Sequence, residues 1–309
     1  MPLLIAINGD LASGKSSLAG DLSNRLGVVV VSTGMIHRAI AEHRGHSTLE
    51  LNRIAEADAA IDDLVDGILQ ERGRSGESLI LDSRLAFHFL PQSFKVHLTI
   101  DPKVGAKRAL QRLGDLVEGY GSGPEALTQL EERRSSERAR FLARYGVDID
   151  FLRNYDLVVD TTSADTDYAA AIVLDHLNEG TAERDLAKGG PSLFLDPRRL
   201  LPSESTARLA RPESKHLVEV VRSEGFRSTS SVSVGLAERF FFILDGHRRT
   251  SAAIVAGLPA IPCNLVAQDA EMLPIGISAS QFMRSEISRR EIYDWESAHR
   301  MYFTRYPFG

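Results

Sequence analysis

A glycine-rich stretch near the N-terminus has the residue types that hold the phosphates of a nucleotide. Gly9 to Ser16 reads GDLASGKS, a complete G-x-x-x-x-G-K-S/T pattern between a short apolar run and a helical pattern. Its glycines let the backbone curl so that successive N–H groups face phosphate oxygens, and the following helix start adds partial positive charge. The stretch therefore predicts binding of a nucleoside triphosphate. It does not identify the reaction, because several classes of nucleotide-binding proteins share it.

The positions in this phosphate loop have separate expected roles. Lys15 is predicted to reach the β- and γ-phosphates as a catalytic residue, and the Ser16 hydroxyl is predicted to ligate Mg²⁺. The expected nucleotide-binding set is Gly9, Ala12, Ser13, Gly14, Lys15, Ser16 and Ser17.

An arginine-rich segment could supply further cations. Four arginines lie within about two turns of one predicted helix: Arg133, Arg134, Arg138 and Arg140. A transferring phosphoryl group spreads negative charge over several oxygens, so its transfer needs positioning and nearby cations. A mobile lid could fold these arginines over the phosphates and expel water. The segment also fits a solvated basic face paired with the neighbouring glutamates.

Alternating apolar and helical patterns must position these groups. Five runs rich in Val, Ile or Leu predict buried strands: Leu3–Ile7, Gly27–Val31, Ser78–Asp82, Phe94–Ile100 and Asp156–Asp160. Helical patterns lie between them, such as Leu18, Leu22 and Leu26 at i+4 spacing and the run from Val104 to Leu113. The alternation predicts an α/β fold with a parallel five-stranded sheet and helices on both faces.

The length of 309 residues predicts two domains. The polar stretch Glu179–Pro191 follows a helical run at Tyr168–Leu177, so we place a first domain at 1–180, a linker at 181–191 and a second domain at 192–309 with a helical tail. The second domain is predicted to be a smaller α+β unit. Its expected strands are Ser192–Leu195, Phe240–Leu244 and Ala260–Val266, and its expected helices are Glu213–Glu224 and Arg248–Ala256.

Composition excludes several classes of protein. No apolar run reaches the ~18 to 20 residues of a membrane span, so a cytoplasmic protein is expected. Cys263, the single cysteine, rules out an internal disulfide and a Cys-rich zinc site, and it is expected to be a buried apolar residue. Residues 185–309 hold 16 Lys+Arg and 14 Asp+Glu, which leaves 20 and 28 for the rest, or net charges of +2 and −8. Neither part has the basic excess of a nucleic-acid-binding protein.

Further segments of the first domain carry a resemblance to a known family. In order, they are Ser32–Arg38 (STGMIHR), Asp82–Leu85 (DSRL), Arg133–Phe141 (RRSSERARF), Tyr145–Asp148 (YGVD) and Tyr155–Thr161 (YDLVVDT). From Leu4 to about Leu177 the chain thereby resembles the short, archaeal-type cytidylate kinases of the nucleoside monophosphate kinase group. The resemblance implies a P-loop kinase fold that uses ATP and Mg²⁺.

The resemblance also implies roles for individual residues. Lid residues Arg133 and Arg140 would be catalytic, and the acceptor site would contain Thr33, Arg38, Asp82 and Arg84. Asp82 fits either an orienting role for the waters of Mg²⁺ or a structural role. Three positions depart from the family pattern: Asp10-Leu11 at the loop start, Ser83 in place of glycine and Arg134 in place of an acidic lid residue. The acceptor therefore stays open between a nucleoside monophosphate and a small metabolite that replaces one.

The second domain carries a resemblance of its own. Leu244-Asp245-Gly246-His247-Arg248-Arg249, followed by Gly257-Leu258 and Ile261-Pro262, resembles the ParB/sulfiredoxin-like fold over roughly Ser192 to Val266. The resemblance implies a phosphate or nucleotide site at Asp245, Gly246, His247, Arg248 and Arg249. The same residues also fit a turn before a helix with solvated arginines.

Three functions of that fold can be compared with the sequence. Sulfiredoxin chemistry needs a cysteine where this chain has Gly246. DNA partitioning needs a further DNA-binding domain downstream, and only 43 residues follow Val266 in this sequence. The fold's free serine kinases remain, because Leu200–Glu204 (LLPSE) is similar to their L-x-P-x-E segment. Glu204 would then be a catalytic general base on a substrate hydroxyl, or else an ordinary surface glutamate.

The sequence thus predicts a two-domain phosphotransferase whose partners are a nucleotide and a small acceptor, with no membrane or nucleic acid partner. A homodimer stays open. One alternative places a serine kinase activity in the second domain. Another is a nucleotide-sensing binding protein without turnover.

Overall fold

The computed structural model describes residues 2–45, 59–111, 121–178, 190–206, 212–226 and 231–308. The chain forms two compact units. Unit 1 comprises Met1–Asp150, Asn154–Asp156 and Asp165–Glu179, and unit 2 comprises Phe151–Arg153, Leu157–Ala164 and Gly180–Gly309. Most of the predicted linker at 181–191 lies outside the described residues.

The strands of unit 1 form a parallel array, as the sequence predicts. They are β1 (Leu4–Gly9), β2 (Val29–Ser32), β3 (Leu79–Asp82) and β4 (Phe94–Thr99), in the order β2-β3-β1-β4. Ile5 of β1 pairs with Ile80 on one side and with Phe94 on the other. Strands β1 and β3 are buried along their whole length, which explains their continuous apolar sequences.

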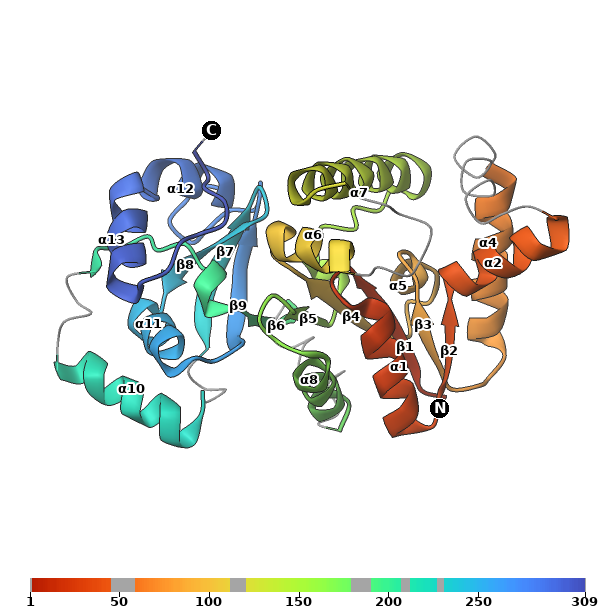
Figure 1. Ribbon diagram of the computed structural model, residues 1–309, viewed down its shortest axis with the longest axis horizontal. Coiled ribbons are helices and arrows are strands. Elements are labelled where there is room, and N and C mark those ends of the chain that lie inside the picture. The colour runs from red at the N-terminus through yellow and green to blue at the C-terminus, as the bar shows by residue number, and fades with distance from the viewer. Residues whose placement is uncertain are drawn as a thin grey trace. The chain divides into compact units, whose positions relative to one another are not determined.

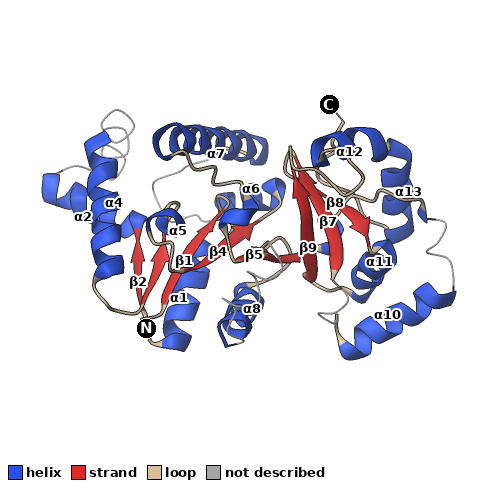
Figure 2. Ribbon diagram, turned by 180° about the vertical axis from the view of Figure 1, so that it is seen from behind, coloured by secondary structure: helices blue, strands red, loops and turns tan. Residues whose placement is uncertain are grey.

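Helices surround these strands (Figure 1, Figure 2). They are α1 (Lys15–Leu26), α2 (Thr33–Arg44), α4 (Ala59–Arg74), α5 (Ala86–Phe89), α6 (Pro102–Gln111), α7 (Gly123–Tyr145) and α8 (Thr166–Asn178). Helix α1 packs against α8, and α6 packs against α7 on the other side of the strands. Unit 1 therefore has the α/β arrangement that the sequence predicts, with α2, α4 and α5 in addition to the helices named from the sequence.

Helix α7 carries the arginine-rich segment and is called the lid helix below. It begins at an N-cap, where the Ser122 hydroxyl accepts the Glu125 N–H, and it ends at Gly146 in the left-handed region. Its buried residues Ala126, Leu130 and Phe141 are spaced so that they share one helical face. Arg134 lies one turn after Leu130 on this face, so the lid helix turns a cation inward where an apolar residue would be expected.

Unit 2 contains parallel and antiparallel strands. They are β5 (Leu157–Asp160), β6 (Ser192–Leu195), β7 (Val232–Ala237), β8 (Phe240–Asp245) and β9 (Ile261–Gln268), in the order β5-β6-β9-β7-β8. The pairs β5/β6 and β7/β9 are parallel, whereas β6/β9 and β7/β8 are antiparallel. Its helices are α10 (Pro212–Glu224), α11 (His247–Ala256), α12 (Ala279–Glu286) and α13 (Arg289–His299), with a short 3-10 turn at Pro197–Arg199. Another 3-10 turn, Leu152–Asn154, is divided between the two units.

Unit 2 differs from the sequence prediction at two strands. Strand β5, expected within the first domain at 1–180, is grouped with unit 2, where it pairs with β6. Strand β7, which contains Gly235, was not predicted. The structure supplies the reason for this glycine, since a Cβ there would lie 2.2 Å from the ring of Phe242.

Two further expectations concern Cys263 and membrane-spanning segments. Cys263 is buried in β9, as predicted, and burial raises the pKa of its thiol. Among the described residues, no helix combines the length and apolar character needed to cross a membrane.

Candidate active site

The phosphate loop joins the end of β1 to the start of α1. Gly14 is the N-cap of α1 and has a φ of 93°, a left-handed conformation that glycine adopts without strain. No side chain caps this helix start, so its first N–H groups are available to an anion. Gly9 is required for a different reason, because a Cβ there would lie 2.5 Å from the carbonyl oxygen of Leu98. The loop's geometry is that of a phosphate cradle.

The ammonium of Lys15 lies over this loop. Its Nζ is 3.3 Å from the carbonyl oxygen of Gly9 and 3.4 Å from that of Asp10. Burial, followed by the positive charge of Arg84, lowers the pKa of Lys15 to about 7. An incoming phosphate would stabilise the charged ammonium, so the site is poised to gain a proton with its ligand.

Ser16 and Asp82 meet beside the loop, from the first turn of α1 and the end of β3. The Ser16 hydroxyl donates to Oδ2 of Asp82 at 2.7 Å, and the Thr33 hydroxyl lies 3.5 Å from the Asp82 carbonyl oxygen. Hydroxyl and carboxylate oxygens are the ligands that Mg²⁺ prefers, and Mg²⁺ in nucleotide sites needs only one or two of them from the protein. The pair therefore fits Mg²⁺, although the described residues contain no cluster of three or more His, Cys, Asp or Glu that could hold a metal alone.

Arg84 lies between the phosphate loop and the lid helix. Its Nη1 donates to the carbonyl oxygen of Gly9, and its Nε lies 3.2 Å from Oε2 of Glu137. Although burial favours the protonated acid, Arg84 and then Arg133 hold the pKa of Glu137 below its usual value. Arg84 thus contacts both the phosphate loop and the lid helix.

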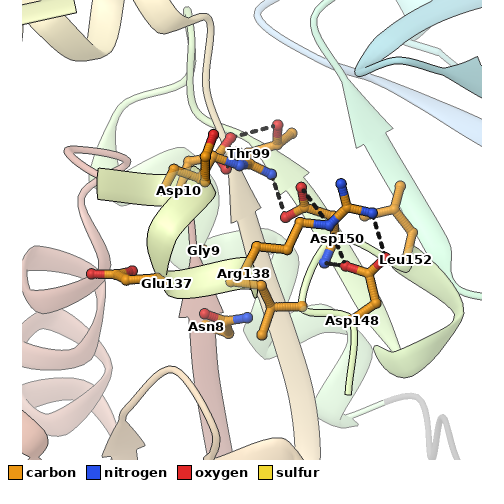
Figure 3. A network of polar contacts seen from close by, with 12 residues as sticks. Asn8, Gly9, Asp10, Thr99, Glu137, Arg138, Asp148, Asp150 and Leu152 are labelled. Carbon is orange, nitrogen blue, oxygen red and sulfur yellow. Dashed lines mark hydrogen bonds and ion pairs between the residues drawn. The ribbon is translucent and has the colours of Figure 1, made fainter. Parts of the chain in front are cut away.

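The lid helix contributes a second group of ion pairs. Arg134 donates from Nη1 to Oδ1 of Asp10 and from Nη2 to Oδ1 of Asp150, the latter at 2.5 Å. Arg138 donates to both carboxylate oxygens of Asp148, at 2.7 and 2.5 Å. Figure 3 shows Arg138 beside Asp148 and Asp150, with Asp10 next to Thr99.

The lid arginines predicted to be catalytic lie elsewhere on the same helix. Arg133 has a side chain 48% exposed and pairs with Glu137 one turn along, at 3.0 Å. Arg140 is also exposed. The side chain of Arg38 lies outside the described residues, while its backbone belongs to α2.

Sequence reasoning missed the roles of Asp10, Glu137 and Asp150. Glu137 occupies the inward face of the lid helix between Leu130 and Phe141, and this helical spacing was the available signal. No comparable local pattern marks Asp150, which comes near the loop only through the fold.

The second predicted phosphate site lies in unit 2, where β8 leads into α11. Gly246 is the N-cap of α11 with a φ of 108°, and no side chain caps this helix either. Arg249 donates to the Ser231 carbonyl oxygen at 2.8 Å and to Asp245 at 2.7 Å. Asp245 and Arg248 are exposed. The five predicted residues are consecutive in the sequence and therefore lie together at one helix start.

His247 links this turn to Glu204. Its Nε2 accepts the backbone N–H of Ser203 at 3.0 Å, and its Nδ1 lies 4.0 Å from Oε2 of Glu204. The imidazole is 8% exposed, whereas the Glu204 side chain is 47% exposed. The histidine is thus held by the backbone on one side and faces a solvent-accessible carboxylate on the other.

Comparison with known proteins places the first part of the chain in a family. Residues 5–139 match the model of a family described as AAA domain. The cytidylate kinase of Methanothrix thermoacetophila is 38% identical over 52% of this chain and 88% of its own length. Those of Methanobrevibacter smithii and Haloarcula marismortui are 34% and 35% identical, over 57% and 60% of this chain and 98% and 95% of their own lengths.

Similarity to solved structures is weaker. A shikimate kinase from Bacteroides thetaiotaomicron aligns with 57% of this chain and 98% of its own, at 17% identity and a TM-score of 0.42. A likeness of this size supports no argument about function. The curated relatives are matched over most of their length, and the chain is therefore a phosphotransferase that belongs to the cytidylate kinase family.

Proposed function

We propose that unit 1 transfers the γ-phosphoryl group of ATP, with Mg²⁺, to a nucleoside monophosphate such as CMP or to a small metabolite in its place. The observation that carries the proposal is the meeting of Lys15 with the Ser16–Asp82 pair at one phosphate cradle. A cradle alone would bind nucleotide. The hydroxyl–carboxylate pair adds a site for Mg²⁺, and the arginine-bearing lid helix adds the cations that transfer requires.

In this mechanism the backbone N–H groups at the start of α1 bind the β- and γ-phosphates of ATP. Lys15 gains its proton as the phosphates arrive and then stabilises the charge that develops on the transferring group. Ser16 and Asp82 would hold Mg²⁺, which when bound neutralises charge on the phosphate oxygens. Arg133 and Arg140, exposed on the lid helix, are the cations proposed to reach the γ-phosphate.

The acceptor is proposed to lie next to Thr33, Arg38, Asp82 and Arg84. Arg84 supports this placement, because its guanidinium touches the Gly9 carbonyl oxygen and therefore lies at the edge of the cradle. Ser83 is buried, and its hydroxyl accepts the N–H of Leu85 at 3.3 Å. The Ser83 side chain is thus turned toward its own backbone.

An assay of ADP release tests this function. The full chain is given ATP and Mg²⁺ with CMP, UMP, AMP, GMP and free serine in turn. We expect turnover with at least one monophosphate, loss of this turnover in Lys15→Ala by a factor of about 10³ or more, and no change in Glu204→Ala. Tight nucleotide binding without turnover on any acceptor would instead favour a nucleotide-sensing protein.

A second candidate function is phosphorylation of serine or a similar hydroxyl compound by unit 2. The contact that favours it is His247 beside Glu204, next to the uncapped start of α11. Glu204 would accept the proton of a substrate hydroxyl, and His247 would orient the carboxylate. Serine-dependent ADP release that survives Lys15→Ala and disappears in Glu204→Ala would establish it. The absence of any serine-dependent release would remove it.

A further inference from the structure

Arg134 of the lid helix and Asp10 of the phosphate loop meet in unit 1 although they lie far apart in the sequence. Nη1 of Arg134 donates to Oδ1 of Asp10, and Nη2 lies 2.5 Å from Oδ1 of Asp150. The side chains of Asp10, Arg134 and Asp150 are only 6%, 14% and 12% exposed. The guanidinium is therefore held between two carboxylates and is largely removed from water.

The Asp10 carboxylate is fixed in place by the end of β4. Its Oδ2 accepts the Thr99 hydroxyl at 3.1 Å (Figure 3) and the Ile100 N–H at 3.2 Å. The Asp10 N–H donates to the Leu98 carbonyl oxygen at 2.8 Å. The carboxylate cannot turn away from the loop without breaking these bonds. A fixed negative charge thus lies within the segment that must bind a highly negative triphosphate, and it would repel this ligand if it were not compensated.

Apolar packing holds the lid helix to the same part of the loop. Leu11, directly after Asp10, packs against a cluster formed by Ala106 of α6 with Ala126 and Leu130 of α7. Arg134 is one helical turn beyond Leu130, so the ion pair continues the line of contacts along the inward face. The pair is therefore part of the docking of α7 on the loop.

We propose that Arg134 is a positioning residue that neutralises Asp10 and tethers the lid helix to the phosphate loop, and that it is not a ligand of the transferred phosphate. Its two terminal nitrogens already donate to Asp10 and Asp150, whereas Arg133 and Arg140 face solvent. The inference rests on the nucleotide binding proposed for this loop and on no particular acceptor.

A comparison of variants tests the assignment by calorimetry with ATP and Mg²⁺. Arg134→Gln should weaken ATP binding by about tenfold or more, because Asp10 then repels the phosphates. Asp10→Asn should bind ATP at least as well as the unmodified chain. The decisive variant combines both changes, and its dissociation constant should lie within about twofold of that of Asp10→Asn. If Arg134 binds phosphate, the combined variant should instead be about tenfold weaker than Asp10→Asn, and this result would overturn the proposal.

Thermal unfolding without nucleotide provides an independent form of the same test. Arg134→Gln should lower the unfolding midpoint, and the combined variant should lose clearly less than the sum of the single changes. Additive losses would contradict the tether.

Arg144→Gln is the matched control on the same helix, because Arg144 also forms an ion pair, with Asp63 at 2.6 Å. This variant should leave the affinity for ATP unchanged. Since the unfolding test needs no nucleotide, an unmodified chain that fails to bind ATP would count against the proposed function and not against the tether.

Discussion

Two helices of this chain start in the same way and have different surroundings. Helix α1 follows β1 and α11 follows β8, each begins at a glycine in the left-handed region, and neither has a side-chain cap. At α1 a hydroxyl meets a carboxylate, Ser16 with Asp82, whereas at α11 an imidazole faces one, His247 with Glu204. The helix start offers an anion site in both places. The neighbouring oxygens suit a metal-assisted phosphoryl transfer in the first, and the imidazole–carboxylate pair suits proton transfer in the second.

The largest expected effect concerns a carboxylate at the end of a strand in each region, Asp82 of β3 and Asp245 of β8. Asp82→Asn should lower kcat for nucleotide-dependent transfer by about 10²- to 10³-fold, because the proposed Mg²⁺ site would lose a charged ligand. Asp245→Asn, at the end of β8, should change this rate by less than about twofold. Steady-state kinetics over a range of Mg²⁺ concentrations measures both. Equal losses in the two variants would show that the regions do not work separately.

A smaller effect distinguishes the two N-cap glycines. Gly14→Ala should destabilise the protein by about 1–2 kcal/mol, because alanine is strained at a φ of 93°. Gly246→Ala should cost about 2–3 kcal/mol, because its Cβ would also lie 3.1 Å from a methyl group of Val232. Urea unfolding followed by circular dichroism measures both losses. Trp295, the single tryptophan, lies buried in unit 2, so its fluorescence should report the second loss selectively.

The effect that is smallest over any single pH unit is a dependence of stability on pH, which belongs to the first region. Lys15 has a pKa of about 7 in the folded chain, compared with an ordinary value of 10.5. The unfolded chain therefore binds more protons between these values, and this group makes the protein more stable as pH rises through that window, by at most about 1.4 kcal/mol per pH unit.

The same proton links pH to nucleotide binding. Because phosphates favour the charged ammonium, ATP binding at pH 8 should take up close to one proton, and affinity should fall as pH rises above 7. Calorimetry in buffers of different ionisation enthalpy measures this uptake. Lys15→Arg should abolish it, since arginine stays charged. Unchanged uptake in this variant would assign the proton to another group.

Local patterns in the sequence predict the parts of unit 1 that depend on neighbouring residues. The apolar runs predict β1 to β4 because buried parallel strands need continuous apolar sequence, and the loop pattern predicts the turn that Gly9 and Gly14 make possible. Contacts between distant segments are not visible in this way. Asp10 and Arg134 were each noted as departures from the family pattern, and only the fold shows that they contact one another.

Segments of the two units alternate along the sequence, and this affects any attempt to produce one unit without the other. A fragment that stops at the predicted boundary of residue 180 contains β5 but lacks β6, its parallel partner. The fragment would carry the unsatisfied N–H and C=O groups of a buried apolar strand, a template for pairing between molecules. Purification of such a piece should therefore yield aggregates, and a cut placed after Leu195 would only move the open edge to β6, which would lose its antiparallel partner β9.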